Sequence, residues 1–136
     1  MPTIRVLICD DAIAFPVLLQ HWLADTRDLE VVGTVTSGAQ AVEEIGELQP
    51  DVVLLDHLMY DVPGGSLELA PRLREQCPGV GIVLMSGMPG PDVATIAARC
   101  SADAHVSKAS RPEQMCAAVR DAHARAHADA RAELLN

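Results

Sequence analysis

Aromatic residues are almost absent from this sequence, which has one Trp, one Tyr and one Phe among 136 residues. Ring stacking therefore cannot build its core. Hydrophobic residues nevertheless make up 49% of the chain, which is enough for the core of about one domain. We expect one domain with a tail, packed from Val, Ile, Leu, Ala and Met side chains.

Basic residues are also scarce, with 10 Lys and Arg against 19 Asp and Glu and a formal net charge of -9. A surface of this sign repels the phosphate backbone of nucleic acids. The charge therefore argues against direct nucleic-acid binding by this chain and favours proteins as partners.

Signals for export, membrane insertion and zinc binding are missing. The four cysteines form no C-x-x-C pair, and the N-terminus has no apolar signal segment. No apolar run reaches the roughly 18 residues that a transmembrane helix needs. His123 and His127, four residues apart in an alanine-rich tail, are interpreted as a solvated helix face rather than a metal site. We expect a cytoplasmic protein that makes no use of a membrane.

Short apolar runs rich in branched residues alternate with helical patterns along the chain. The runs predict strands at 4–9, 31–36, 52–55, 81–85 and 104–107. Helices are expected at 15–24, from Ser37 to Pro50, at 66–76 with Pro71 as a kink or a late start, from Pro91 onward and from Ser110 onward. With right-handed crossovers, this alternation predicts an α/β fold, a doubly wound five-stranded parallel sheet of the flavodoxin-like type with strand order 2-1-3-4-5.

Two of these helices begin with a capping-box pattern, in which a serine caps the first turn and a residue three positions later reaches back. Ser37 and Gln40 form the pattern at the second helix, and Ser110 and Glu113 form it at the last. Segment 124–136 is expected to extend the last helix into solvent.

Polar residues stand where four of the apolar runs stop. They are Asp10, Asp11, Asp56, Ser86 and Lys108. Because the carboxyl ends of parallel strands meet at one edge of a sheet, these residues are expected to share a crevice. Three carboxylates packed together are unfavourable without a cation, and hard oxygen ligands suit Mg2+. The implied chemistry is a phosphoryl group meeting a carboxylate.

Four motifs resemble those of bacterial two-component response-regulator receiver domains, over nearly all of residues 3–123. The motifs are Cys9-Asp10-Asp11, residues 52–56 followed by Met59 and Gly64, residues 84–87, and residues 105–108. The first helix and Ser107-Lys108-Ala109 are most similar to receivers of the NarL/LuxR-type subfamily, which normally carries a helix-turn-helix output domain. We expect a receiver domain at 1–123 and a helical extension or start of a linker at 124–136.

The resemblance implies a role for each site residue. Asp56 would take a phosphoryl group from a sensor histidine kinase. Asp10, Asp11, Asp56 and the backbone carbonyl of Leu58 would hold Mg2+, with Asp10 acting through water. Lys108 and Ser86 would contact the phosphoryl oxygens. Ser86 and the switch residue His105 would shift the surface of the fourth helix, fifth strand and fifth helix.

The sequence departs from the family pattern at several positions. Tyr60 replaces a usual proline, which predicts a less rigid loop, and His105 replaces a usual Tyr or Phe, which predicts a weak or pH-sensitive switch. Leu58 and Met88 flank the phosphoryl site with side chains that cannot hydrogen-bond an attacking water. They predict slow self-dephosphorylation.

The favoured function is a phosphorylation-controlled signalling switch rather than an enzyme, either as a stand-alone receiver or as the receiver part of a transcription regulator. Its output would then pass to a second copy of itself or to a downstream protein. A pseudo-receiver scaffold acting by contact alone stays open. An aspartate-nucleophile phosphatase needs a second acid two residues after the nucleophile, where this chain has Leu58. A nucleotide or flavin module needs glycines where Asp10 and Asp11 stand.

Overall fold

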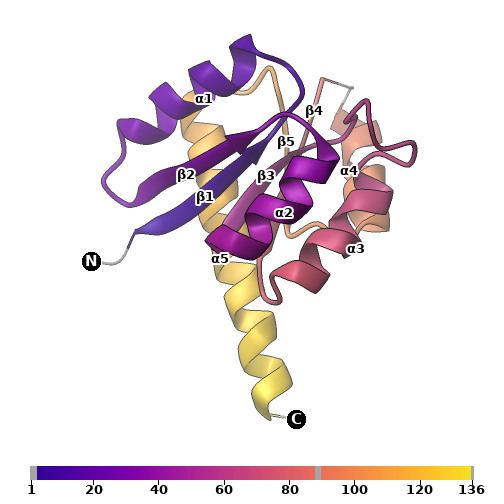
Figure 1. Ribbon diagram of the computed structural model, residues 1–136. Helices are drawn as coiled ribbons and strands as arrows, with labels where there is room; N and C mark the ends of the chain where they lie inside the picture. The colour runs from indigo at the N-terminus through magenta and orange to yellow at the C-terminus, as the bar shows by residue number, and fades with distance from the viewer. Residues whose placement is uncertain (1–2, 88–89, 136) are drawn as a thin grey trace.

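The computed structural model describes residues 3–87 and 90–135 and contains one five-stranded parallel sheet (Figure 1). The strand order is β2-β1-β3-β4-β5, which confirms the predicted flavodoxin-like topology. The strands are β1 (Ile4–Cys9), β2 (Leu29–Val35), β3 (Val52–Asp56), β4 (Gly81–Ser86) and β5 (Ala104–Ser107). The three central strands are buried on both faces, as their continuous apolar runs require.

Helices cover both faces of the sheet. They are α1 (Ala14–Ala24), α2 (Gly38–Leu48), α3 (Ser66–Gln76), α4 (Gly90–Arg99) and α5 (Pro112–Leu135). Alternate residues of β1 show the division: Leu7 packs with α2 and α3, whereas Val6 packs with α1 and α5. Leu84 of β4 packs with α4. The core is therefore two apolar layers separated by the sheet.

Most predicted boundaries hold, and the differences are small. The strand 104–107 and the helix 66–76 are confirmed, and this helix continues through Pro71, so the predicted late start is wrong. β2 begins two residues earlier than predicted, and β3 and β4 extend to include Asp56 and Ser86. The ladders with neighbouring strands continue past the last apolar residue, which apolarity alone does not reveal.

The capping box predicted at α2 forms with one altered partner, and the one predicted at α5 does not form. The Ser37 hydroxyl accepts from Gln40 N–H at 3.1 Å, but Gln40 Oε1 accepts from Thr36 N–H at 3.1 Å rather than from Ser37. At α5 the helix begins at Pro112, and Gln114 Oε1 accepts from the backbone N–H of Arg111 at 2.9 Å. The predicted Ser110–Glu113 box is therefore wrong: Arg111 precedes the helix and only the bond from Gln114 is made.

The last helix extends well beyond the sheet and runs to Leu135, in agreement with the predicted extension of this helix. Figure 1 shows the end of α5 projecting away from the rest of the molecule. Its upper part packs closely on β4 because Gly81 has no side chain: a Cβ there would lie 2.8 Å from the carbonyl oxygen of Ala122. Ala126 is its last buried residue.

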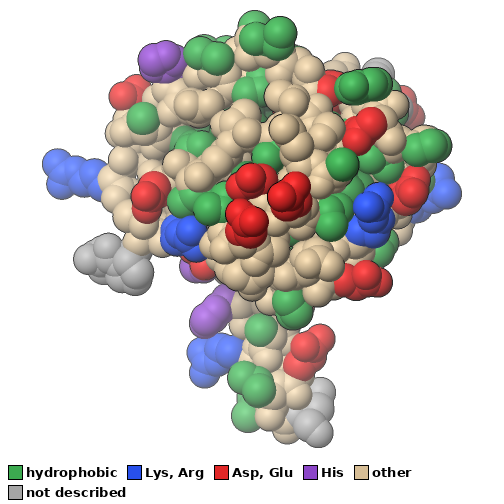
Figure 2. Space-filling view, viewed as in Figure 1, with side chains coloured by type: hydrophobic (Ala, Val, Ile, Leu, Met, Phe, Trp, Pro, Cys, Tyr) green, Lys and Arg blue, Asp and Glu red, His purple; other side chains and the backbone are tan. Residues whose placement is uncertain are grey.

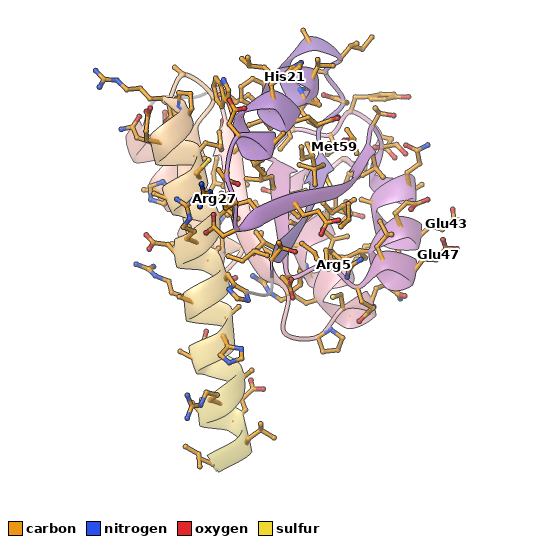
Figure 3. The ribbon with its side chains drawn as sticks, turned by 90° about the vertical axis from the view of Figure 1, so that its left-hand side faces the viewer. Arg5, His21, Arg27, Glu43, Glu47 and Met59 are labelled. Atoms are coloured by element: carbon orange, nitrogen blue, oxygen red, sulfur yellow. The ribbon has the colours of Figure 1, made fainter. Side chains whose placement is uncertain are left out.

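Acidic side chains gather over α2 in the space-filling view (Figure 2). Figure 3 shows Glu43 and Glu47 pointing away from the body of the protein, and both are exposed. This acidic surface lies across the sheet from α1 and α5, because α2 packs on the other apolar layer.

Candidate functional site

Three carboxylates meet at the carboxyl edge of the sheet. Asp10 and Asp11 follow β1, and Asp56 ends β3, the strand paired with β1. One oxygen from each of the three lies within 4.8 Å of the other two. Asp10 is fully buried and Asp56 is 7% exposed. The predicted convergence of these residues is confirmed.

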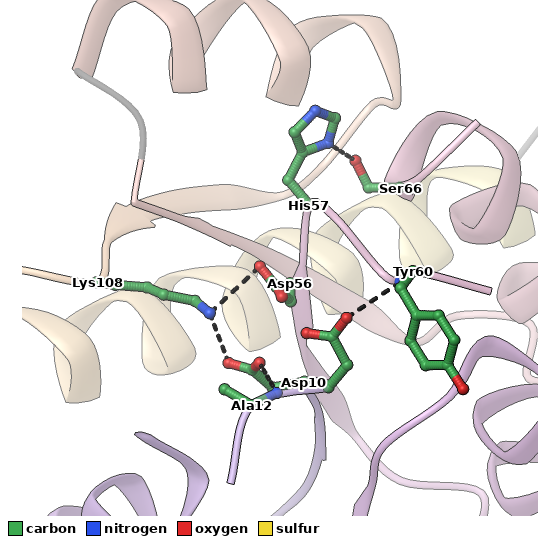
Figure 4. A network of polar contacts seen from close by, with 8 residues as sticks. Asp10, Ala12, Asp56, His57, Tyr60, Ser66 and Lys108 are labelled. Carbon is green, nitrogen blue, oxygen red and sulfur yellow. Dashed lines mark hydrogen bonds and ion pairs between the residues drawn. The ribbon is translucent and has the colours of Figure 1, made fainter. Parts of the chain in front are cut away.

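Lys108 brings the positive charge to this cluster. Its Nζ lies 2.7 Å from Asp10 Oδ2 and 3.4 Å from Asp56 Oδ1 (Figure 4). Its backbone N–H donates to the Ser86 carbonyl at 2.9 Å, so β4 and the segment after β5 are joined beside the cluster. The Lys108 ammonium also lies 5.2 Å from the centre of the Phe15 ring, within the range of a cation–π contact.

The charges in the cluster do not balance, because three carboxylates face one ammonium. Burial and the neighbouring Asp10 carboxylate raise the pKa of Asp56 to about 6, against the pull of Lys108. Burial lowers the pKa of Lys108, but the hydrogen bond and charge of Asp10 and the charge of Asp56 outweigh it, so the net shift is upward. The cluster offers only hard oxygen ligands with excess negative charge, which fits Mg2+.

The other predicted site residues differ in burial. Ser86 ends β4 and is 3% exposed. Leu58 follows Asp56 by two residues and is 64% exposed, and His105 of β5 is also exposed. Met88 lies outside the described residues.

The family comparison matches this arrangement. Residues 6–120 match the response regulator receiver domain family. The chain belongs to this family. It is thus a response regulator receiver of a two-component system, a signalling module rather than a catalytic enzyme.

Individual relatives support the assignment. The chain is 28% identical over 118 residues to the response regulator protein VraR of Staphylococcus aureus, covering 87% of this chain and 56% of VraR. It therefore spans about half the length of the curated relatives it matches. The signal receiver domain of NarL from Mycobacterium tuberculosis is 29% identical, with a TM-score of 0.79 over 90% of this chain and 98% of that one. The response regulator domain of Thermotoga maritima CheB is 25% identical, with a TM-score of 0.76 over 89% and 96%.

Among the described residues of this receiver domain, no helix combines the length and apolar character needed to cross a bilayer.

Tyr60, where receivers usually have proline, contributes a hydrogen bond that sequence reasoning missed. Its backbone N–H donates to Asp11 Oδ2 at 3.1 Å (Figure 4). Proline has no N–H and could not make this bond. The loop after β3 is therefore tied directly to the acidic cluster, which the prediction of a less rigid loop did not include.

Asp61 is a second residue of this loop whose contacts were missed. Its carboxylate accepts from Gly38 N–H at 2.8 Å and from Ala39 N–H at 3.3 Å, at the free N-terminus of α2. The Gly38 N–H bond is the main cause that lowers the pKa of Asp61. The partners are 23 residues apart, so no local sequence signal links them.

The far end of the same loop is fixed by His57, Gly65 and Ser66. His57 Nδ1 lies 2.7 Å from Ser66 Oγ, and the Ser66 N–H donates to the His57 carbonyl at 2.9 Å. Gly65 has a φ of 57°, and a Cβ there would lie 2.5 Å from the His57 carbonyl oxygen. Only glycine fits this turn. The loop of this receiver domain is thus held at both ends and at its centre.

Proposed function

We propose that Asp56 accepts a phosphoryl group from a sensor histidine kinase in a Mg2+-dependent reaction. The observation that carries this proposal is the position of Asp56, buried at the end of β3 within 4.8 Å of two further carboxylates and beside Lys108. No other acidic residue of the cluster ends the central strand.

In this reaction an Asp56 carboxylate oxygen attacks the phosphorus, an O–P bond forms and the N–P bond to the kinase histidine breaks. Asp11 and the Leu58 carbonyl would hold Mg2+ directly and Asp10 through water. When bound, Mg2+ would neutralise charge on the phosphoryl oxygens. The Lys108 ammonium, held by Asp10 at 2.7 Å, is close enough to follow the new phosphoryl group on Asp56.

Ser86 and His105 form the proposed switch. The hydroxyl of Ser86 would donate to a phosphoryl oxygen and draw the β4–α4 segment toward Asp56, shifting the surface of α4, β5 and α5. A histidine at the switch position should make the response weak or pH-sensitive, because burying a histidine costs more when it is charged. Equal phosphorylation-induced changes at pH 6 and pH 8, or an unaltered response in His105→Ala, would contradict this role.

Leu58 is proposed to slow the loss of the phosphoryl group. Its exposed apolar side chain follows the acceptor by two residues and cannot orient an attacking water. Replacing it by asparagine should therefore shorten the lifetime of the phosphorylated form, measured by the decay of phosphoprotein in intact-mass spectra. A lifetime of seconds that Leu58→Asn leaves unchanged would exclude this role.

The wider biological assignment is part of the same proposal. We propose a receiver domain at 1–123, with 124–136 as a helical extension or the start of a linker, and a cytoplasmic location. Its output passes through a second copy or a downstream protein, as a stand-alone receiver or as part of a transcription regulator. Because the net charge of this chain is negative, any contact with DNA would have to be made by another domain.

The test is the intact mass of the protein after incubation with Mg2+ and acetyl phosphate. A gain of about 80 Da, the mass of one phosphoryl group, is expected for wild type and not for Asp56→Asn. Asp51→Asn is the matched control: Asp51 immediately precedes β3, at the other end of the strand from Asp56, so this variant should still gain the mass. No gain in wild type with acetyl phosphate or with a cognate kinase would instead favour a pseudo-receiver that signals by contact.

A further inference from the structure

A groove of about 430 Å³ opens between α1 and the beginning of α5, away from the acidic cluster. Trp22 and Cys116 supply apolar lining, and Asp25, Glu113 and Arg120 supply charged lining. The groove therefore combines an aromatic face with charged groups.

The charge of this groove is negative. Arg120 is already engaged, because its Nε and Nη2 donate to the Asp28 carboxylate at 2.7 and 2.9 Å. Within residues 3–87 and 90–135, neither Asp25 nor Glu113 forms an ion pair. Two uncompensated carboxylates beside an indole attract a cation, which gains both ionic and cation–π contacts.

A line of ring contacts connects the groove with the acidic cluster. The Trp22 ring meets the Phe15 ring edge to face, with centroids 6.3 Å apart and planes at 88°. The Phe15 ring centre in turn lies 5.2 Å from Lys108 Nζ, which contacts Asp10 and Asp56. Phe15 is thus in contact with both the Lys108 ammonium and the Trp22 ring.

We propose that this groove binds an arginine or lysine side chain of a protein partner, and that Phe15 and Trp22 couple its occupancy to the phosphorylation of Asp56. Binding itself needs only the groove, whereas the coupling rests on the proposed function. A phosphoryl group on Asp56 draws the Lys108 ammonium toward its oxygens and away from Phe15, which loosens the ring pair. By linkage, the partner's cation alters the phosphorylation equilibrium by the same factor.

Intrinsic fluorescence tests the groove directly, because Trp22 is the only tryptophan of the chain. A tetra-arginine peptide titrated into the full chain should give a saturable change in Trp22 emission, and tetra-glutamate should give none. The double variant Asp25→Asn/Glu113→Gln should weaken tetra-arginine binding by about threefold to tenfold, the effect of losing two partly exposed ionic contacts.

The matched control is Glu43→Gln/Glu47→Gln, which removes two exposed acids from α2 on the opposite layer. This variant has the same net charge as the groove variant and should bind tetra-arginine as wild type does. An equal loss in both double variants, or no saturable change in wild type, would overturn the groove as a specific site. A dimer in analytical ultracentrifugation that only the groove variant abolishes would assign the groove to a second copy instead.

The coupling is tested by repeating the tetra-arginine titration with phosphorylated protein. Its phosphorylation is first verified by intact-mass measurement. The affinity for tetra-arginine should change at least threefold on phosphorylation in wild type and stay constant in Phe15→Leu. A constant affinity in phosphorylated wild type, or an unchanged shift in Phe15→Leu, would overturn the coupling. A failure of the proposed function can be told apart from a failure of the groove. If Asp56 is not phosphorylated, the mass gain is absent, but the tetra-arginine titration of unphosphorylated protein without Mg2+ still measures binding to the groove.

Discussion

Aspartates behave differently at the two edges of this sheet. At the amino edge, Asp51 accepts a hydrogen bond from Arg5 N–H and Asp103 accepts one from Ile82 N–H, each at 2.8 Å. At the carboxyl edge, Asp10 and Asp56 lie beside each other and share one lysine. The first pair extends the hydrogen bonding of neighbouring strands, whereas the second concentrates charge that the fold does not neutralise.

This difference separates structural from functional aspartates. Burial raises the pKa of Asp103, but the Ile82 N–H opposes the shift. For Asp56 the neighbouring carboxylates add to the effect of burial, and its pKa reaches about 6. A carboxylate destabilised by its neighbours costs folding free energy that a bound cation or phosphoryl chemistry relieves.

The largest expected effect is a gain in stability from Asp56→Asn in metal-free protein at pH 7.5. The raised pKa means that the folded state holds this proton more tightly than the unfolded chain. The stabilising contribution of the Asp56 proton to the free energy of unfolding is therefore fully present below about pH 4. It is lost as the pH rises through about 6, and by pH 7.5 the loss is on the order of 2–3 kcal/mol. Urea unfolding should show the variant more stable by about this amount.

The gain should disappear at pH 4 and shrink when millimolar Mg2+ stabilises wild type. Asp51→Asn, at the other edge, provides the matched control and should show no such gain. If Asp56→Asn were less stable than wild type at pH 7.5 without Mg2+, the contrast between the two edges would be incorrect.

A loss of about 2 kcal/mol is expected for Asp51→Ala at the amino edge. The substitution removes the charged acceptor of the partly buried Arg5 N–H. Asp51→Asn keeps an acceptor oxygen and should recover most of this free energy of unfolding, again measured in urea. Equal stability of Asp51→Ala and wild type would show that this hydrogen bond is not what holds the edge.

The smallest effect is expected for Asp28→Asn, which breaks the ion pair with Arg120. Both side chains are 45% exposed, so the loss should be about 0.5 kcal/mol or less and should vanish in 1 M salt. Arg120 lowers the pKa of Asp28, so this contribution is present near neutral pH and is lost as Asp28 is protonated in acid. A salt-independent loss above 1 kcal/mol would point to packing rather than charge.

The sheet order was predictable because strands and helices alternate along the chain, and the acidic cluster was predictable because its residues stand where apolar runs stop. Each run determines a buried strand, and the residue after it is delivered to the shared edge. The same principle located Asp10, Asp56 and Lys108 without knowledge of any contact.

Other parts of the site were not predictable, because their partners come from distant elements. The Phe15 ring beside Lys108 and the Asp61 carboxylate at the N-terminus of α2 depend on three-dimensional packing. The predicted capping box at α5 was wrong, because Ser110 and Glu113 match the sequence pattern while the helix begins at Pro112, where only Gln114 reaches back to the Arg111 N–H. Local patterns give element identity more reliably than the exact first residue.

The unbroken course of α5 has a geometric consequence. At 1.5 Å per residue the nine residues after Ala126 carry the helix axis roughly 14 Å beyond its last buried contact. A rigid rod held only at its upper half converts a tilt at the sheet into a larger displacement at its tip. The direction in which the side chains at its far end point also depends on helix length, since deleting one residue from 127–135 would turn that end by about 100°. Whatever contacts this tip is therefore sensitive to helix length as well as to sequence.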